Sequence, residues 1–176
     1  VEHTPAPRLA AFDGLNRVVH IGSFSKSLSA SVRCGFIAAP REWIEGLTDL
    51  KIATSFGNGR LSSELVLTLL KDGSYRKHME TVCARLSRAM SNTIARLKTI
   101  GITPWIDQQA GMFLWCTLPD GIDAATVARK ALAANVVLAP GNAFSLSQTA
   151  GGFLRFNVAQ SDDKRIYEVL ETVMKQ

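Results

Sequence analysis

The sequence predicts an α/β fold made of two parts that one long helix connects. Two short apolar runs, at 18–21 and 34–39, have the length and composition of strands. Apolar residues then recur every three or four positions between 79 and 97, which is typical of one long amphipathic helix. Strand and helix patterns alternate after that helix. The predicted parts are residues 1–73, a connecting helix at 74–101 and a small α/β domain at 102–176.

Composition indicates a globular protein. With 176 residues, 47% of them hydrophobic and 20% charged, the chain can bury one good core or two small ones. No apolar run reaches the roughly 20 residues that cross a bilayer, and the first residues lack a signal-peptide pattern. The net charge of +5 would suit nucleic acid, but the basic residues are interleaved with acids, which favours surface solvation.

The three cysteines carry information about the cellular compartment and do not indicate a metal site. Cys34, Cys83 and Cys116 are far apart, odd in number and without metal-ligand spacing. We expect buried free thiols in a reducing cytoplasm, and we predict no metal site.

The first part is predicted to contain two strands and two helices. Residues 1–15 are expected to form an extended lead-in, followed by a buried strand at 18–21 and a second strand at 34–39. Pro40 suits the first turn of a helix because its missing N–H does no harm there. That helix presents Trp43, Ile44, Leu47 and Leu50, breaks at 55–59, and precedes a second helix at 61–71.

The connecting helix is predicted to begin near Ser74 and to end before Gly101, a typical C′ residue. Its apolar stripe is expected to be core and consists of Met79, Val82, Leu86, Met90, Ile94 and Leu97.

The small domain is predicted to follow the order β-α-β-β-α. Its strands are expected at 112–118, 136–139 and 153–158, with Phe113 and Trp115 in the core. Asp123 is expected to cap a helix at 124–134. Ser161 is expected to cap the last helix, with Asp162 and Asp163 in its first turn. The buried face of that helix would be Ile166, Val169, Leu170 and Val173.

The loop after the first strand carries the strongest chemical signal. Lys26 stands among Ser23, Ser25 and other hydroxyls, and Arg33 follows shortly after. A lysine amine forms a Schiff base with an aldehyde once desolvation or a neighbouring charge lowers its pKa. Hydroxyls and a forked guanidinium hold a phosphate. The loop therefore suits an aldehyde cofactor that carries a phosphate.

Plainer interpretations stay open for each of these residues. Lys26 can be an ordinary surface lysine and Arg33 one member of a structural ion pair. Ser23 can cap a turn, and Ser25 can support one.

A second candidate site lies on the last predicted strand. Arg155 alternates with Leu154 and Phe156, so its side chain faces the opposite side of the sheet. An arginine between apolar neighbours needs a partner. That partner is either a substrate carboxylate or an internal one, and Asn157 lies on the same face and can assist. His20 is interpreted as a strand residue with a satisfied ring.

Several of these segments together resemble one family. Ser-Phe-Ser-Lys at 23–26 with Arg-Cys-Gly at 33–35 resembles the cofactor-lysine segment of fold-type I aminotransferases, which use pyridoxal 5'-phosphate (PLP). The spacing is most similar to the MocR group of GntR-type transcriptional regulators and to 2-aminoadipate-type aminotransferases. Further segments that agree are 36–40, 111–115, 139–144 and 153–157. The usual Pro-Gly of the loop is Ala30-Ser31 here.

The resemblance implies the C-terminal part of the PLP-dependent transferase fold. It implies that Lys26 is the Schiff-base lysine and that Ser23, Ser25 and Arg33 belong to the cofactor site. Arg155, with Asn157, would hold the α-carboxylate of an amino acid. The family's ring-stacking aromatic, its pyridine-pairing aspartate and its glycine-rich phosphate loop have no counterpart here. We therefore expect part of a longer protein, with only part of an active site.

Two functions follow from the resemblance. The first is the effector-sensing domain of a MocR-type regulator, which binds PLP and an amino acid or its keto acid. The alternative is part of a stand-alone class I aminotransferase of the 2-aminoadipate type. A third, non-catalytic interpretation is an oligomerisation module. We expect a cytoplasmic homodimer that reaches DNA only through a domain outside this chain and does not contact a membrane.

Overall fold

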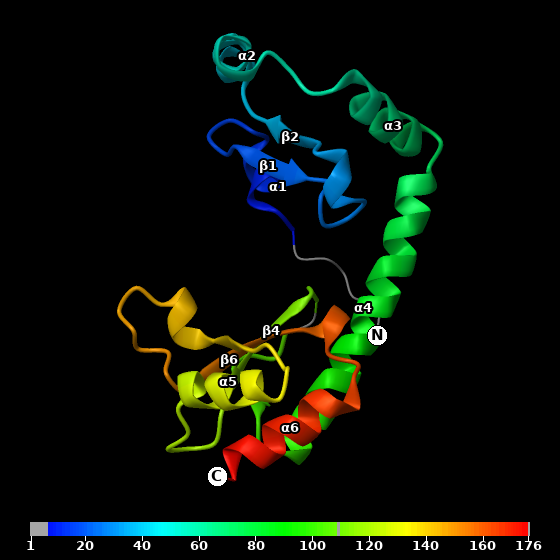
Figure 1. Cartoon of the computed structure of the whole chain (residues 1–176). Helices are drawn as coiled ribbons and strands as arrows, with labels where there is room; N and C mark the ends of the chain where they lie inside the picture. Colours follow the sequence, from blue (N-terminus) through cyan, green and yellow to red (C-terminus); the bar gives the residue numbers. More distant parts are fainter. Residues whose placement is uncertain (1–6, 109, 176) are drawn as a thin grey trace. The chain divides into compact units, whose positions relative to one another are not determined.

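The computed structural model describes residues 7–108 and 110–175 (Figure 1). It divides into two compact units, Val1–Thr81 and Val82–Gln176. One helix, α4 (Ser74–Thr99), spans the division along the chain, as the apolar stripe predicts. Within the described ranges, no helix combines the length and the apolar character needed to cross a membrane.

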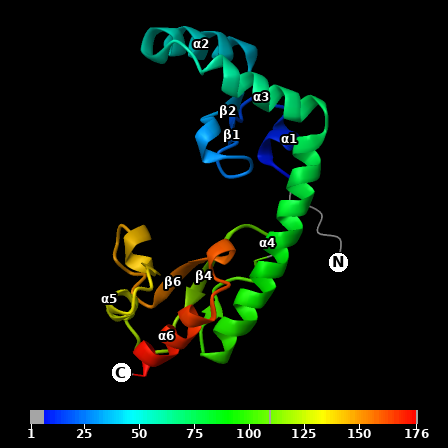
Figure 2. The ribbon, with the colours of Figure 1, turned by 45° about the vertical axis from the view of Figure 1, so that its right-hand side comes forward.

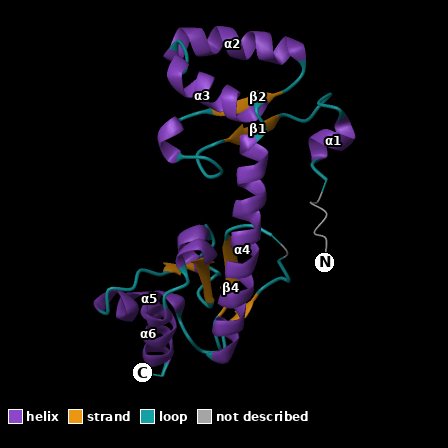
Figure 3. Cartoon of the chain, turned by 90° about the vertical axis from the view of Figure 1, so that its right-hand side faces the viewer, coloured by secondary structure: helices purple, strands orange, loops and turns teal. Residues whose placement is uncertain are grey.

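Over residues 7–81 the first unit contains a two-stranded sheet, three helices and the start of α4 (Figure 3). Strands β1 (His20–Ser23) and β2 (Gly35–Ala38) pair antiparallel, with Ser23 opposite Gly35. Gly35 allows this close pairing, because a Cβ there would lie 2.7 Å from the Gly22 carbonyl oxygen. The other elements are α1 (Leu9–Asp13), the 3₁₀ turn η1 (Ala30–Val32), α2 (Arg41–Ser55) and α3 (Arg60–Lys71).

Two predictions for this unit were wrong. Within the lead-in, of which residues 1–6 lie outside the described residues, α1 replaces extended chain. It ends where Gly14 takes a left-handed conformation and donates to the Ala10 carbonyl over 3.1 Å. The first strand begins two residues later than predicted and is not buried, since Ile21 is 71% exposed. The small core of this unit, Phe24, Val32 and Val66, does not cover that side chain.

Helix α4 ends as the glycine predicts. Gly101 has a φ of +80°, and its N–H donates to the Lys98 carbonyl over 3.2 Å. The N–H of Ile102 donates to the Leu97 carbonyl over 3.0 Å. This pair of bonds is the Schellman motif, and it turns the chain directly into the core.

The second unit is a four-stranded antiparallel sheet in the order β3-β4-β6-β5. Its core alternates along the central strands, where Leu114 and Leu154 are fully buried. Leu97 of α4 and Leu170 of α6 pack against the same face. The elements are β3 (Thr103–Pro104), β4 (Phe113–Thr117), α5 (Ala124–Ala133), β5 (Ala139–Pro140), η2 (Gly141–Phe144), β6 (Phe153–Asn157), η3 (Val158–Gln160) and α6 (Lys164–Met174).

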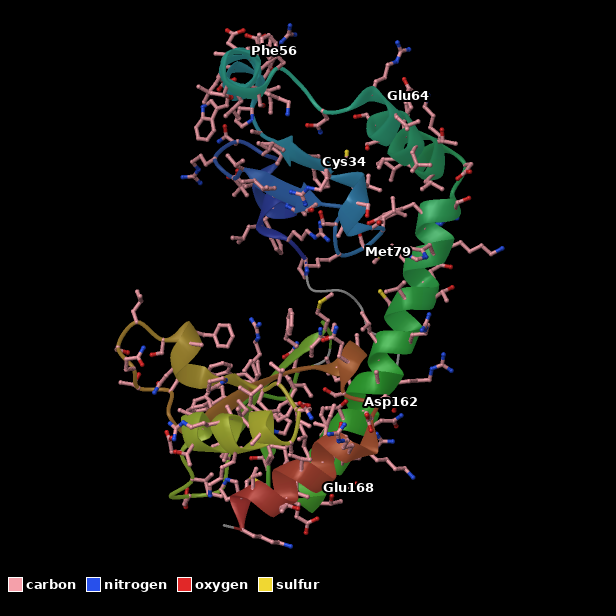
Figure 4. The ribbon with its side chains drawn as sticks, viewed as in Figure 1. Cys34, Phe56, Glu64, Met79, Asp162 and Glu168 are labelled. Carbon is pink, nitrogen blue, oxygen red and sulfur yellow. The ribbon has the colours of Figure 1, made fainter. Side chains whose placement is uncertain are left out.

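The start of α6 is fixed against α4, and the two helices lie side by side in Figure 2. Arg96 of α4 donates to the Asp162 carbonyl over 2.6 Å, and its guanidinium lies 5.4 Å from the Tyr167 ring centre. Figure 4 shows Asp162 beside α4. The Tyr167 hydroxyl donates to the Ser161 carbonyl over 2.6 Å, which closes the turn.

Three predictions for this unit were wrong, and alternation along a strand explains the first. Phe113 and Trp115 lie on the face opposite the core, because Leu114 and Cys116 occupy the core positions. The strand expected at 136–139 is only Ala139–Pro140. Asp163, not Ser161, caps α6, since its carboxylate accepts the Arg165 N–H over 2.9 Å.

Asp123 caps α5 as predicted, accepting the Thr126 N–H over 2.8 Å. The cysteines are free, but only Cys116 is buried; Cys34 is half-buried and Cys83 is exposed, contrary to expectation.

Candidate functional site

Lys26 lies at the exposed apex of a tight turn that follows β1. The Phe24 carbonyl accepts two N–H groups across that turn, from Leu28 over 2.8 Å and from Ser29 over 3.2 Å. Phe24 itself is buried, and its N–H donates to the Cys34 carbonyl over 3.0 Å, extending the pairing of β1 with β2. Hydrogen bonds therefore fix the backbone of this turn, while the side chain of Lys26 is exposed to solvent. Within the described ranges, no carboxylate pairs with Lys26.

The two serines before the lysine have different environments. Ser23 is exposed at the end of β1, and its hydroxyl oxygen accepts the Ser25 N–H over 3.1 Å. Its hydroxyl hydrogen remains free to donate to an anion. Ser25 is half-buried within the turn. The hydroxyl oxygen of Ser23 thus supports the turn, as the plainer interpretation expects. Its hydroxyl hydrogen can still donate to a bound anion.

Arg33 has an unusual backbone. Its φ of 47° and ψ of 41° place it in the left-handed region, which residues other than glycine seldom adopt. It follows the 3₁₀ turn η1, which contains Ala30 and Ser31. Among the described residues no carboxylate pairs with Arg33, which argues against the ion-pair interpretation. Four other non-glycine residues in the described ranges also have a positive φ, so the guanidinium without a carboxylate partner, rather than the backbone, makes Arg33 a candidate for binding an anion.

A cavity of about 640 Å³ lies between the sheet and α2. Arg33 lines it together with Gly22, Gly35 and Lys51, whereas Lys26, Ser23 and Ser25 do not. The pairing of Ser23 with Gly35 places Ser23 and the residues just before Gly35 at the same end of the β1–β2 pair. The structure therefore brings the four predicted cofactor residues to one end of this sheet without enclosing them in one cavity.

Arg155 is held by aromatic rings instead of a carboxylate. Its guanidinium carbon lies 4.0 Å from the centre of the Phe144 ring and 4.5 Å from that of Phe113. None of the ion pairs within residues 7–108 and 110–175 includes Arg155, so the internal-carboxylate alternative finds no support. A guanidinium between two rings keeps its N–H edge free for a planar anion.

Asn157 shares a cavity of about 410 Å³ with Arg155. Its side-chain oxygen accepts the Ala159 N–H over 3.1 Å and so caps the turn η3. The amide NH₂ remains as a donor for a ligand in that cavity. The structure thus brings the two predicted substrate residues together, within the second unit.

Three residues near these sites were not predicted to take part. Tyr75 and His78 of α4 contact Ser27 beside Lys26, and Phe144 covers Arg155. Tyr75 and His78 lie 48 and 51 positions from Ser27, and Phe144 lies 11 positions from Arg155. Local sequence patterns do not predict contacts at these separations. The spacing of Tyr75 and His78, three apart on a helix, was the only available signal of a shared face. His20, predicted to be satisfied, contacts Arg8 through Nε2 over 2.9 Å.

The chain is similar to proteins of two functional classes. The family model described as aminotransferase class I and II matches residues 2–173. An uncharacterized HTH-type transcriptional regulator, YdfD of Bacillus subtilis (strain 168), is 27% identical over 96% of this chain and 36% of its own length. The aromatic-amino-acid aminotransferase 1 of Thermococcus litoralis is 29% identical over 93% of this chain and 40% of its own length.

Among solved structures, LysN of Thermus thermophilus is similar at a TM-score of 0.78 with 30% sequence identity. LysN is an α-aminoadipate aminotransferase, complexed in that structure with N-(5'-phosphopyridoxyl)-L-leucine. The similarity covers 95% of this chain and 44% of LysN, so the chain spans less than half the length of these relatives. The fold is a part of the fold shared by PLP-dependent aminotransferases. Since the family model matches nearly the whole sequence, the chain belongs to the aminotransferase class I and II family.

Proposed function

We propose that this chain is the PLP-binding, aminotransferase-like part of the effector domain of a MocR/GntR-type transcriptional regulator. The observation that carries the proposal is the anchored turn with exposed Lys26 at its apex and Arg33 at the same end of the β1–β2 pair. This donor set suits an aldehyde that carries a phosphate.

The residues fit PLP in separate roles. Lys26 would hold the aldehyde carbon covalently through its amine. Arg33 would bind the phosphate through its guanidinium, and Ser23 would donate its hydroxyl hydrogen to the same group. Ser25 would support the turn. When bound, PLP supplies an electron sink for the α-carbon of an amino acid. The amine of Lys26 would then be the base that moves the proton of that carbon.

Arg155 would recognise the α-carboxylate of the amino acid. The rings of Phe113 and Phe144 restrict the guanidinium, so less side-chain freedom is lost when a carboxylate binds. Asn157, in the same cavity, would add an amide donor. The bound species in this proposal is an amino acid or its keto acid.

The regulator function is supported by similarity to YdfD over 96% of the chain. A second function, part of a stand-alone class I aminotransferase of the 2-aminoadipate type, is supported by the 30% identity to LysN. In the first case, amino-acid binding would shift the population of two arrangements of a longer protein. In the second, the same residues would complete transamination.

We propose the domain division 1–73, 74–101 and 102–176 for this chain within the longer fold. A cytoplasmic homodimer is proposed with it, and DNA contact would require a separate domain. Support for the compartment comes from the free cysteines. The exposed apolar side chains of the first unit, such as Leu61 at 85% exposed, would pack against the rest of the longer fold or against a second copy.

The test uses the full-length protein encoded by the gene, loaded with PLP and supplied with a panel of amino acids. An amino-acid-dependent change in the affinity for DNA upstream of its own gene supports the regulator. Keto-acid formation with turnover and no DNA binding supports the enzyme. PLP uptake that is unchanged in Lys26→Ala overturns both.

A further inference from the structure

The turn that carries Lys26 is held from the first two turns of α4. The Tyr75 hydroxyl donates to Ser27 Oγ over 2.9 Å, and His78 Nε2 lies 2.9 Å from the Ser27 carbonyl oxygen. A carbonyl oxygen only accepts, so His78 carries a hydrogen on Nε2. Both groups therefore act on the residue that directly follows Lys26.

The other side of the turn is held by the same helix. The Tyr75 ring packs edge-on against the Phe24 ring, with centroids 5.6 Å apart at an angle of 80°. Phe24 stands two residues before Lys26 and is buried. Tyr75 thus contacts the turn on both sides of the lysine, while the lysine itself stays exposed.

We propose that Tyr75 and His78 are positioning residues for Lys26, acting through Ser27. This inference rests on the proposed function, since it gives the lysine a covalent task. A lysine that must meet an aldehyde carbon gains from a backbone fixed in one conformation, because less entropy is lost when the bond forms. The two hydrogen bonds and the ring contact supply that restriction.

Substitutions at Tyr75 and His78 can remove the two hydrogen bonds one at a time. Tyr75→Phe keeps the ring on Phe24 and removes only the donor to Ser27. His78→Leu removes the ring donor, whereas His78→Gln keeps an N–H donor at similar reach. Lys77→Leu, one position from His78 on the same helix, is the matched control, since no hydrogen bond or ion pair joins its side chain to the turn within the described ranges.

Two measurements on the full-length protein test the inference. The first, on protein without cofactor, is hydrogen exchange at the amides of Leu28 and Ser29. The second is the rate at which PLP attaches to Lys26, followed by its visible absorbance. A hydrogen bond worth about 1 kcal/mol implies roughly fivefold effects per variant. We expect faster exchange and slower attachment in Tyr75→Phe and His78→Leu, with His78→Gln and Lys77→Leu near wild type.

The outcomes separate this inference from the proposed function. Unchanged exchange and attachment in both Tyr75→Phe and His78→Leu would overturn the positioning role while leaving Lys26 as the attachment residue. Failure of His78→Gln to restore exchange would also overturn the role of the His78 donor. If the wild-type protein does not take up PLP, the proposed function fails, and this inference fails with it, whatever the exchange data show.

Discussion

The guanidinium of Arg155 lies 4.0 Å from the centre of the Phe144 ring, although the two residues come from different elements, β6 and η2. Together with Phe113, this ring holds a cation that has no carboxylate partner among the described residues. The arrangement leaves the hydrogen-bonding edge of Arg155 free, which is the state that an anion-binding arginine needs before its ligand arrives.

Phe144→Leu tests the role of the ring. Leucine keeps apolar bulk but removes the π face, so a cation–π contribution of about 0.5–2 kcal/mol should be lost. Because the contact exists with and without ligand, only its restriction of the free guanidinium affects affinity, so we expect amino-acid binding to weaken by at most about thirtyfold, with cofactor attachment unchanged, as measured by titrating the PLP-loaded protein. Phe144→Tyr, which keeps the π face, is the control. Equal affinity in Phe144→Leu and wild type would contradict the role.

Arg155→Ala tests the carboxylate site itself. Charge-assisted hydrogen bonds contribute about 1.5–3 kcal/mol, so amino-acid affinity should fall by roughly 10- to 150-fold. The cofactor absorbance should remain. An amine without a carboxylate, such as the decarboxylated analogue, should bind both proteins alike. If Arg155→Ala lost cofactor and amino acid together, Arg155 would be structural.

The three thiols should react in order of their exposure. Burial raises the pKa of the Cys116 thiol to about 12, so at neutral pH it stays protonated and unreactive. We expect Cys83, exposed on α4, to be labelled first by a thiol reagent and Cys116 only after unfolding. Mass spectrometry of the labelled peptides gives the order. Early labelling of Cys116 in the folded protein would contradict the packing of β4.

The helix cap at Asp123 should make the second unit sensitive to acid. The Thr126 N–H that it accepts lowers the pKa of the Asp123 carboxyl below its usual value. The stabilisation is present above the unfolded-state pKa and is lost as pH falls through the folded-state pKa. Asp123→Asn keeps a neutral cap, so its Tm should fall less than that of wild type on acidification. Parallel Tm curves would contradict the effect.

The sequence predicted the elements whose signals are local. The stripe from Met79 to Leu97 predicted α4, and Gly101 predicted its end. Errors arose where a choice depended on distant residues. Phe113 lies on the face of β4 away from the core because the helices pack on the other face, which carries Leu114. Ile21 is exposed because the core residues of the first unit do not cover it.

In the candidate site, too, residues with local signals could be predicted, and contacts between distant residues could not. Lys26 and Arg33 were predicted from the hydroxyls and the cation near them, which suit a phosphate, together with the family resemblance, and their roles stay predictions. The contacts of Tyr75 and His78 with Ser27 cross about fifty positions of sequence and depend on tertiary packing. No periodicity within α4 distinguishes half-buried Tyr75 and exposed His78 from an exposed neighbour such as Lys77.

The measurement that tests the central proposal most directly is PLP binding by the full-length protein and its Lys26→Ala variant, followed by visible absorbance and by mass after borohydride reduction. The wild-type protein should gain the absorbance band and, after reduction, a covalent adduct on the peptide that contains Lys26. The variant should show neither while keeping its Tm. A reduced adduct on another lysine, or an unchanged band in Lys26→Ala, would contradict the assignment of Lys26.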